Sequence, residues 1–121
     1  MNEENRSDLK LRTRDFALRV IKLYAALPKT NEAQVIGKQL LRSGTSAGAH
    51  YREAQRAKSD ADFIHKIEGG LQELEESLYW LELLVAAEIV KPDQLKNLTE
   101  ECNELIAIFV TIVTRVKSRR H

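Results

Sequence analysis

The strongest constraint on the fold is a helical apolar periodicity that runs through most of the chain. Apolar side chains recur every three or four residues in four segments, at about residues 8–27, 32–58, 60–88 and 92–117. Only 5 glycines and 2 prolines occur in 121 residues, which leaves too few turns for a sandwich, a barrel or alternating strands and helices. We predict an all-α protein, an antiparallel up-down-up-down four-helix bundle, because short connections make successive helices antiparallel.

Residues typical of helix ends mark the boundaries of these segments. Pro28 ends the first segment, since the residue before a proline is pushed out of the helical region. Asn31 with Gln34, and Ser59 with Asp62, have the spacing of a capping box and predict the next two helix starts.

The last segment begins at Pro92, a residue favoured in the first helical turn. We expect the whole chain, residues 1–121, to be a single four-helix-bundle domain, which its length allows. Residues 1–7 and 118–121 are expected to be frayed ends.

Some apolar residues exceed what a single bundle needs. The predicted inward row of the third segment consists of Ile67, Leu71, Leu74, Leu78, Leu81 and Val85. On a helical wheel Trp80, Leu83 and Leu84 lie well away from this row, and Ile108 lies beside the inward row of the fourth segment. We predict that these four residues form the interface of a homo-oligomer. The alternative is a wide core that absorbs them.

Charge is segregated between the second and third segments, although the formal net charge is only +1. Residues 59–91 hold two lysines against eight acidic residues, whereas residues 31–58 hold five basic residues against two acidic ones. Four cations share the outer face of the second helix: Lys38, Arg42, Arg52 and Arg56. This basic stripe is predicted to bind nucleic-acid phosphates or to pair with the acidic third helix of a neighbouring subunit. A solvated face is the third possibility.

Three patterns suggest chemistry that their context does not support. Residues 44–48 match G-x-S-x-G, but a nucleophile elbow needs a strand before the serine, and the match lies inside a helical pattern. His50 and His65 each precede a glutamate by three residues, yet the inward rows of the first and last helices offer no carboxylate ligand. Cys102 lies on a core row and is expected to be an inert thiol. We predict no enzymatic activity, no catalytic residues, no metal and no cofactor.

The same sequence predicts a cytoplasmic protein with no membrane partner. Residues 1–15 are mostly polar or charged and lack the apolar stretch of a signal peptide. The longest apolar run, which begins at Leu105, is far shorter than the roughly 18 residues that a membrane span needs. The single cysteine excludes an intramolecular disulfide.

Several stretches together carry a family resemblance. They are residues 14–24 (RDFALRVIKLY), 37–54 (GKQLLRSGTSAGAHYREA), 62–66 (DFIHK) and 75–84 (EESLYWLELL). The chain resembles, over about residues 9–116, the bacterial four-helix-bundle family first noticed as reading frames in intervening sequences of 23S rRNA genes. His50 departs from the family, whose members often carry asparagine there.

The resemblance implies a pentamer and kinship to the accessory protein of diversity-generating retroelements, a pentamer that engages a reverse transcriptase and nucleic acid. It implies no established enzymatic activity. We therefore predict a non-enzymatic, homo-oligomeric bundle that is nucleic-acid-associated or scaffolding through its basic stripe. The expected partners are other copies of the chain, RNA or DNA, and a nucleic-acid enzyme. The alternatives are a pure protein-interaction module, with the second and third helices paired across subunits, and a metal-dependent enzyme.

Overall fold

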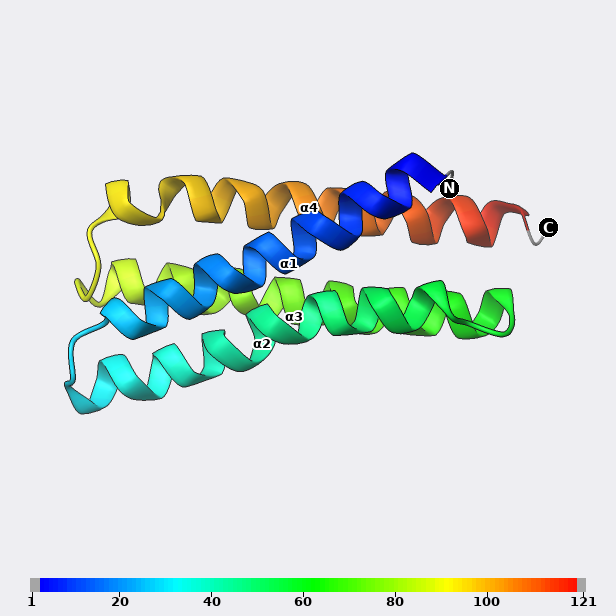
Figure 1. Ribbon diagram of the computed structural model, residues 1–121. Coiled ribbons are helices and arrows are strands. Elements are labelled where there is room, and N and C mark those ends of the chain that lie inside the picture. The colour runs from blue at the N-terminus through cyan, green and yellow to red at the C-terminus, as the bar shows by residue number, and fades with distance from the viewer. Residues whose placement is uncertain (1–2, 120–121) are drawn as a thin grey trace.

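Four long helices make up the protein (Figure 1). The computed structural model describes residues 3–119, with side chains from residue 8 onward. The helices are α1 (Glu3–Ala26), α2 (Asn31–Gln55), α3 (Asp60–Ala86) and α4 (Pro92–Arg119). No strand occurs between residues 3 and 119, so the prediction of an all-α four-helix bundle is confirmed. No helix within this range has a stretch long and apolar enough to cross a lipid bilayer.

The helix ends differ from the predicted ones by a few residues. The α1 helix begins at Glu3 and α4 continues to Arg119, so both helices are longer than the sequence pattern predicted. Residues 1–2 and 120–121 lie outside the described part of the chain. The α2 helix stops at Gln55, because the amide of Arg56 turns to the Glu53 carbonyl in a tighter bond of 3.0 Å.

The cap of α2 lies one residue earlier than predicted. Thr30, not Asn31, precedes the helix in an extended conformation, and its hydroxyl accepts a hydrogen bond from the Ala33 amide at 3.4 Å. Gln34 donates its side-chain amide to the Pro28 carbonyl at 2.9 Å and so fixes the turn between α1 and α2. Asn31 is already inside the helix.

The predicted cap of α3 is confirmed. Ser59 precedes the helix, and its hydroxyl accepts a hydrogen bond from the Asp62 amide at 3.0 Å. The Asp62 carboxylate accepts from the Lys58 amide at 3.3 Å, one residue before the position a capping box would use. These bonds fix the short turn that joins α2 to α3.

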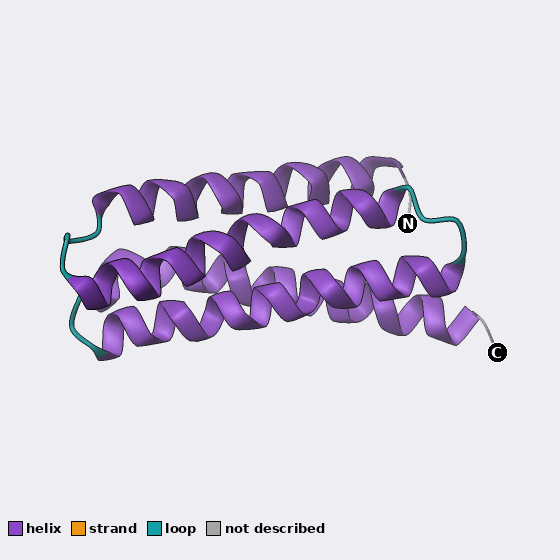
Figure 2. Ribbon diagram, turned by 90° about the horizontal axis from the view of Figure 1, so that it is seen from below, coloured by secondary structure: helices purple, strands orange, loops and turns teal. Residues whose placement is uncertain are grey.

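The helices are arranged so that each packs mainly on its neighbours in the sequence (Figure 2). The α2 helix lies between α1 and α3, and its contact with α3 is the most extensive in the described chain. The α1 and α4 helices touch each other only sparsely. The bundle therefore has one closely packed seam, between α2 and α3, and one open seam, between α1 and α4.

The inward face of α2 is built of small residues, as predicted. All seven residues of its predicted row are buried: Ala33, Gly37, Leu40, Gly44, Ala47, Tyr51 and Ala54. A methyl group at Gly44 would come within 2.9 Å of the Val20 side chain, and one at Gly48 within 3.2 Å of Thr13. These two glycines therefore let α1 lie close to α2.

The predicted inward row of α3 was correct only in part: Ile67, Leu74 and Leu81 are buried. Leu71, Leu78 and Val85 are only half-buried. The buried residues are Ile64, Ile67, Gly70, Leu74, Ser77, Leu81 and Leu84. The reason is that α3 turns small residues toward both neighbouring helices: Ser77 shares a buried hydrogen bond of 2.8 Å with Ser43 of α2, and a methyl group at Gly70 would lie 2.8 Å from the Phe109 ring of α4 and 3.4 Å from the Ala47 carbonyl oxygen of α2.

Candidate nucleic-acid interface

The basic stripe lies on the outer face of α2, as its spacing predicted. Lys38, Arg42, Arg52 and Arg56 are all exposed, and Ala49 between them is exposed too. One row of a helix advances about 1.5 Å per residue, so the stripe extends along nearly the whole length of α2. The four side chains nevertheless differ in whether an acidic residue neutralises their charge.

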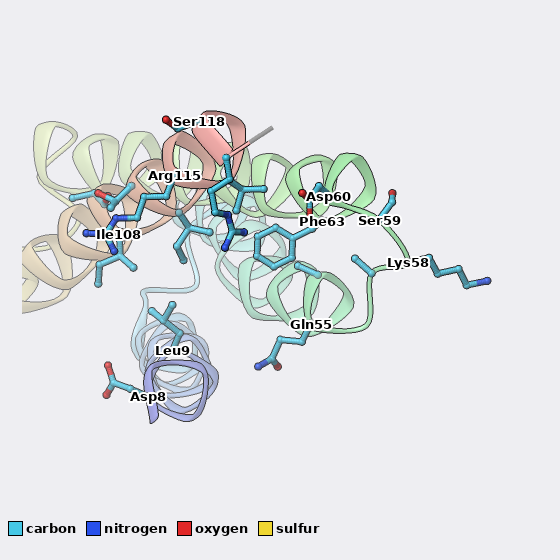
Figure 3. A pocket seen from close by; sticks show the side chains of 17 residues that line it. Asp8, Leu9, Gln55, Lys58, Ser59, Asp60, Phe63, Ile108, Arg115 and Ser118 are labelled. Atoms are coloured by element: carbon cyan, nitrogen blue, oxygen red, sulfur yellow. The ribbon is translucent and has the colours of Figure 1, made fainter. Parts of the chain in front are cut away.

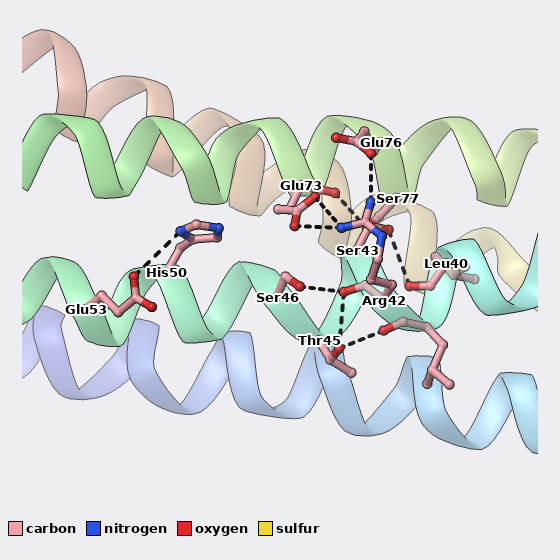
Figure 4. Close-up of polar contacts among 11 residues, drawn as sticks. Leu40, Arg42, Ser43, Thr45, Ser46, His50, Glu53, Glu73, Glu76 and Ser77 are labelled. Carbon is pink, nitrogen blue, oxygen red and sulfur yellow. Dashed lines mark hydrogen bonds and ion pairs between the residues drawn. The ribbon is translucent and has the colours of Figure 1, made fainter.

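Arg42 is neutralised inside its own chain (Figure 4). Its guanidinium donates to the Glu73 carboxylate at 3.1 Å and to the Glu76 carboxylate at 3.0 Å. Both acids belong to α3 and are more shielded from solvent than Arg42, whose side chain is 53% exposed. The basic α2 and the acidic α3 therefore meet within one subunit at this point. If α2 and α3 were paired across subunits, Arg42 would therefore not be available for that pairing.

The remaining three cations are free on the surface. Lys38, Arg52 and Arg56 form no hydrogen bond or ion pair with any side chain from residue 8 to residue 119. Arg52 lies in the last turn of α2 and Arg56 is the residue that follows its end, so two exposed arginines stand close together in the chain at this end of the helix. The cationic part of the stripe is thus the end of α2 near the turn to α3, with Lys38 three turns or more away.

A second set of ions lies beside the stripe on the α3 side. Lys66 Nζ is 3.5 Å from Glu53 Oε2, and His50 Nδ1 is 4.0 Å from the same oxygen. The His50 ring lies against Gly69, where an added methyl group would come within 3.0 Å of it. This cluster contains both signs of charge and so contributes little net field to the neighbouring stripe.

Sequence reasoning did not identify Glu73 and Glu76 as partners of Arg42. The signal was present, because in an antiparallel pair residues equally far from the connecting turn lie opposite each other. Arg42 and the segment containing both glutamates are about equally far from the turn at 58–59. Counting outward from that turn would have predicted that Arg42 is neutralised.

The predicted oligomer interface is not a continuous exposed patch. Leu84 is fully buried in the core of its own chain, so its assignment to an interface was wrong. Trp80, Leu83 and Ile108 are half-buried, and Trp80 and Ile108 pack against the core cluster. The large apolar residues that α1 exposes instead, among residues 8–119, are Leu11, Leu18 and Ile21.

The G-x-S-x-G motif has a structural role inside α2. Ser46 donates its hydroxyl to the Arg42 carbonyl at 2.7 Å, and Thr45 donates to the Leu41 carbonyl at 2.7 Å (Figure 4). Such bonds to the preceding turn are common for hydroxyl residues within helices. The serine has neither the strand before it nor the sharp turn that a nucleophile requires.

His50 and His65 line the same shallow surface pocket, whereas Cys102 is buried in the core. His65 is exposed on α3, and within residues 8–119 no group of three or more His, Cys, Asp or Glu side chains is placed to hold a metal ion. Cys102 is buried and donates its thiol to the Leu74 carbonyl at 3.3 Å. Burial raises the pKa of this thiol to about 12, with a smaller contribution from the charge of Glu101. It therefore stays protonated at neutral pH, which makes it a poor nucleophile.

Comparison with known proteins agrees with this architecture. The sequence profile of the 23S rRNA-intervening sequence protein family matches residues 6–111. A solved structure from Bacteroides thetaiotaomicron VPI-5482, described as a protein with unknown function from the S23 ribosomal protein family, is 38% identical. It superimposes with a TM-score of 0.84, and the match covers 90% of this chain and 97% of the other. A comparison with curated proteins gave no significant match. Neither matching description indicates an enzyme.

Proposed function

Because the chain belongs to the 23S rRNA-intervening sequence protein family, we propose that it is a non-enzymatic bundle that binds structured RNA through α2. The observation that carries the proposal is the pair of exposed, unneutralised guanidinium groups of Arg52 and Arg56, supported by Lys38 on the same face. Arg42 is not part of this contact, because Glu73 and Glu76 already occupy its guanidinium.

The recognition chemistry is that of phosphate binding. A guanidinium donates two parallel hydrogen bonds to one phosphate, and an ammonium acts as a point charge. Two arginines close together in the chain suit neighbouring phosphates, and the opposite sign of the acidic α3 restricts the contact to one side of the molecule. Affinity should fall steeply with salt, since each neutralised phosphate releases condensed counterions.

The test is an electrophoretic titration of structured RNA at two salt concentrations. We expect salt-dependent binding by the unmodified protein and its loss in the double variant Arg52→Glu/Arg56→Glu. The matched control is Arg19→Glu/Lys22→Glu, which reverses two exposed charges on α1 and alters the net charge equally. Equal binding by both variants, or no binding by the unmodified protein at the lower salt concentration, would refute the proposal.

We further propose that the chain self-assembles, and the family resemblance suggests a pentamer. The observation in favour is the apolar side of α1, where Leu11, Leu18 and Ile21 are 57%, 47% and 45% exposed. Size-exclusion chromatography with light scattering should give a multiple of the 13.8 kDa chain mass, and Leu18→Glu should reduce it. A monomer at all concentrations would exclude self-assembly, while the RNA titration is read independently of this result.

A further inference from the structure

The open seam between α1 and α4 widens into a groove at one end of the bundle. There the beginning of α1 and the end of α4 diverge, and the turn between α2 and α3 closes the third side (Figure 3). The groove has a volume of about 1150 Å³. Pockets for drug-sized ligands measure roughly 300–1,000 Å³, so this one is large enough for a segment of protein.

The floor of the groove is apolar. Leu9 of α1 and Phe63 of α3 point into the gap (Figure 3). Three residues of α4 line it at intervals of one helical turn: Ile108, Ile112 and Val116. A ridge with this spacing fits between the side chains of a second helix laid along it.

An ionic contact joins α1 to α4 on the side of the groove away from the chain ends. Arg12 of α1 donates to both carboxylate oxygens of Glu101 on α4, at 2.6 and 3.1 Å, and lies 3.5 Å from Glu104. These bonds raise the pKa of Arg12, the hydrogen bond to Glu101 contributing most. Arg12, Glu101 and Glu104 do not line the groove itself; they join α1 to α4 on its side away from the chain ends.

The rim on the α4 side is basic. Arg115 and Arg119 are exposed one helical turn apart, line the groove, and make no ion pair within residues 8–119. Lys58, at the turn, is directed away from the gap (Figure 3). The α1 side contributes Asp8 and the turn contributes Asp60, so the two walls differ in sign and would orient a charged occupant.

We propose that this groove binds an amphipathic helix of a partner protein, one with an apolar stripe and acidic residues one turn apart. The apolar stripe would cover the floor formed by Phe63, Ile108 and Ile112, as in other helix-in-groove complexes. Its carboxylates would meet the free guanidinium groups of Arg115 and Arg119. This inference does not depend on RNA binding, because it uses a different face and different cations.

The first experiment uses fluorescein-labelled synthetic peptides of about 14 residues, which span about 21 Å as a helix. One peptide carries a leucine stripe flanked by glutamates, a second has the same composition in scrambled order, and a third has lysine in place of glutamate. We expect fluorescence anisotropy to show binding of the first peptide alone, with Kd below about 100 μM. No binding at about 1 mM, or equal binding of the scrambled peptide, would overturn the proposal.

Two protein variants locate the contact. The variant Arg115→Glu/Arg119→Glu should lower the affinity for the acidic peptide by about tenfold or more and raise the affinity for the lysine peptide, since like charges repel and opposite charges attract. The control Lys22→Glu/Lys96→Glu reverses two exposed charges outside the groove. Ile112→Arg should abolish binding, and Val110→Arg, at an exposed position outside the groove, should not. Unchanged affinity in the arginine variant would overturn the proposal even if Ile112→Arg failed to fold.

A second copy of the chain is the competing occupant, and light scattering on the same variants distinguishes it. If Ile112→Arg dissociates an oligomer and the acidic peptide does not compete with that oligomer, the groove is a contact between copies and the proposal is wrong. The variant Arg52→Glu/Arg56→Glu should keep its affinity for the acidic peptide, so failure of RNA binding and failure of peptide binding are separate results.

Discussion

The α2–α3 seam and the α1–α4 seam differ in how closely their two helices pack. Between α2 and α3, small residues bring the two helices so close that a methyl group at Gly70 would lie 3.3 Å from the Cβ atom of His50 and 3.4 Å from the Ala47 carbonyl oxygen. Between α1 and α4 the contact is sparse, Arg12 bridges the helices, and a groove of about 1150 Å³ remains. Close packing leaves no room for a ligand, whereas the open seam leaves apolar surface that a partner can cover.

The difference also separates structural charge from available charge. Arg42 at the closed seam and Arg12 at the open seam are both paired within the chain. Among residues 8–119 the arginines without an ion pair lie elsewhere: Arg19 on α1, Arg52 and Arg56 at the end of α2, and Arg115 and Arg119 on the groove rim. The candidate binding sites therefore lie where arginines are not engaged in ion pairs within the chain.

The largest effect is expected from filling the closed seam. Gly70→Val should lower the free energy of unfolding by about 3 kcal/mol, because the added side chain meets the fully buried Phe109 ring and the Ala47 carbonyl. Chemical denaturation measures the change. Ala107→Val adds a similar volume at the open seam, where the residue is exposed, and should alter stability by less than about 0.5 kcal/mol.

A neighbouring glycine gives a stricter control for this prediction. At Gly69 an added methyl group meets only the half-exposed His50 ring, at 3.0 Å, and that ring can shift. Alanine also favours the helix by up to about 1 kcal/mol over glycine. Gly69→Ala should therefore be neutral or stabilising. If both substitutions destabilise equally, close packing at Gly70 is not what distinguishes the seam.

The next largest effect should come from removing the bridge of the open seam. Arg12→Ala should cost about 1–2 kcal/mol, because it leaves the Glu101 carboxylate, only 18% exposed, without its charged partner. Hydrogen exchange should then speed up in the first half of α1 and much less in α2 or α3. Arg14→Ala removes an exposed arginine from the same helix and should have almost no effect. Uniform acceleration throughout the bundle would mean that Arg12 is not a local tie.

A smaller effect is expected from the buried hydroxyl pair of the closed seam. Ser43 and Ser77 bond each other at 2.8 Å, and the Ser77 hydroxyl also donates to the Glu73 carbonyl at 2.9 Å. Each single change to alanine should cost about 1 kcal/mol, since it removes a hydrogen bond in a buried site. The double variant should cost less than the sum of the two. Additive losses in this double-mutant cycle would show that the hydroxyls act independently.

How far the sequence predicts this molecule depends on which property carries the information. The inward face of α2 was predicted correctly, since Gly37, Gly44 and Ala47 follow a strict helical spacing. The inward face of α3 was predicted only in part, because the prediction chose residues by apolarity alone, whereas small side chains take several of the buried positions. Gly70 and Ser77 occupy the centre of the core because only small side chains fit opposite the small residues of α2.

The candidate sites divide in the same way. The positions of Arg52 and Arg56 on an exposed face follow from local periodicity, and the neutralisation of Arg42 follows from its distance to the turn. The groove can be predicted neither from local periodicity nor from distance to the turn. It depends on the angle at which α1 crosses the bundle, which many side chains set together and which no short segment of sequence records.

The smallest effect is expected from Arg42→Gln, and it tests what holds the closed seam together. The Arg42 side chain is 53% exposed, and ion pairs at such positions contribute between about 0 and 1 kcal/mol. If small-residue packing joins α2 to α3, this substitution should change stability by less than about 0.5 kcal/mol, and added salt should change it no further. The most informative comparison is with the loss of stability in Arg12→Ala, because that ion pair is better shielded from solvent and the helices around it touch only sparsely. A loss from Arg42→Gln as large as that from Arg12→Ala would mean that the closed seam depends on its charges, and that α2 and α3 are held together by electrostatics as well as by shape.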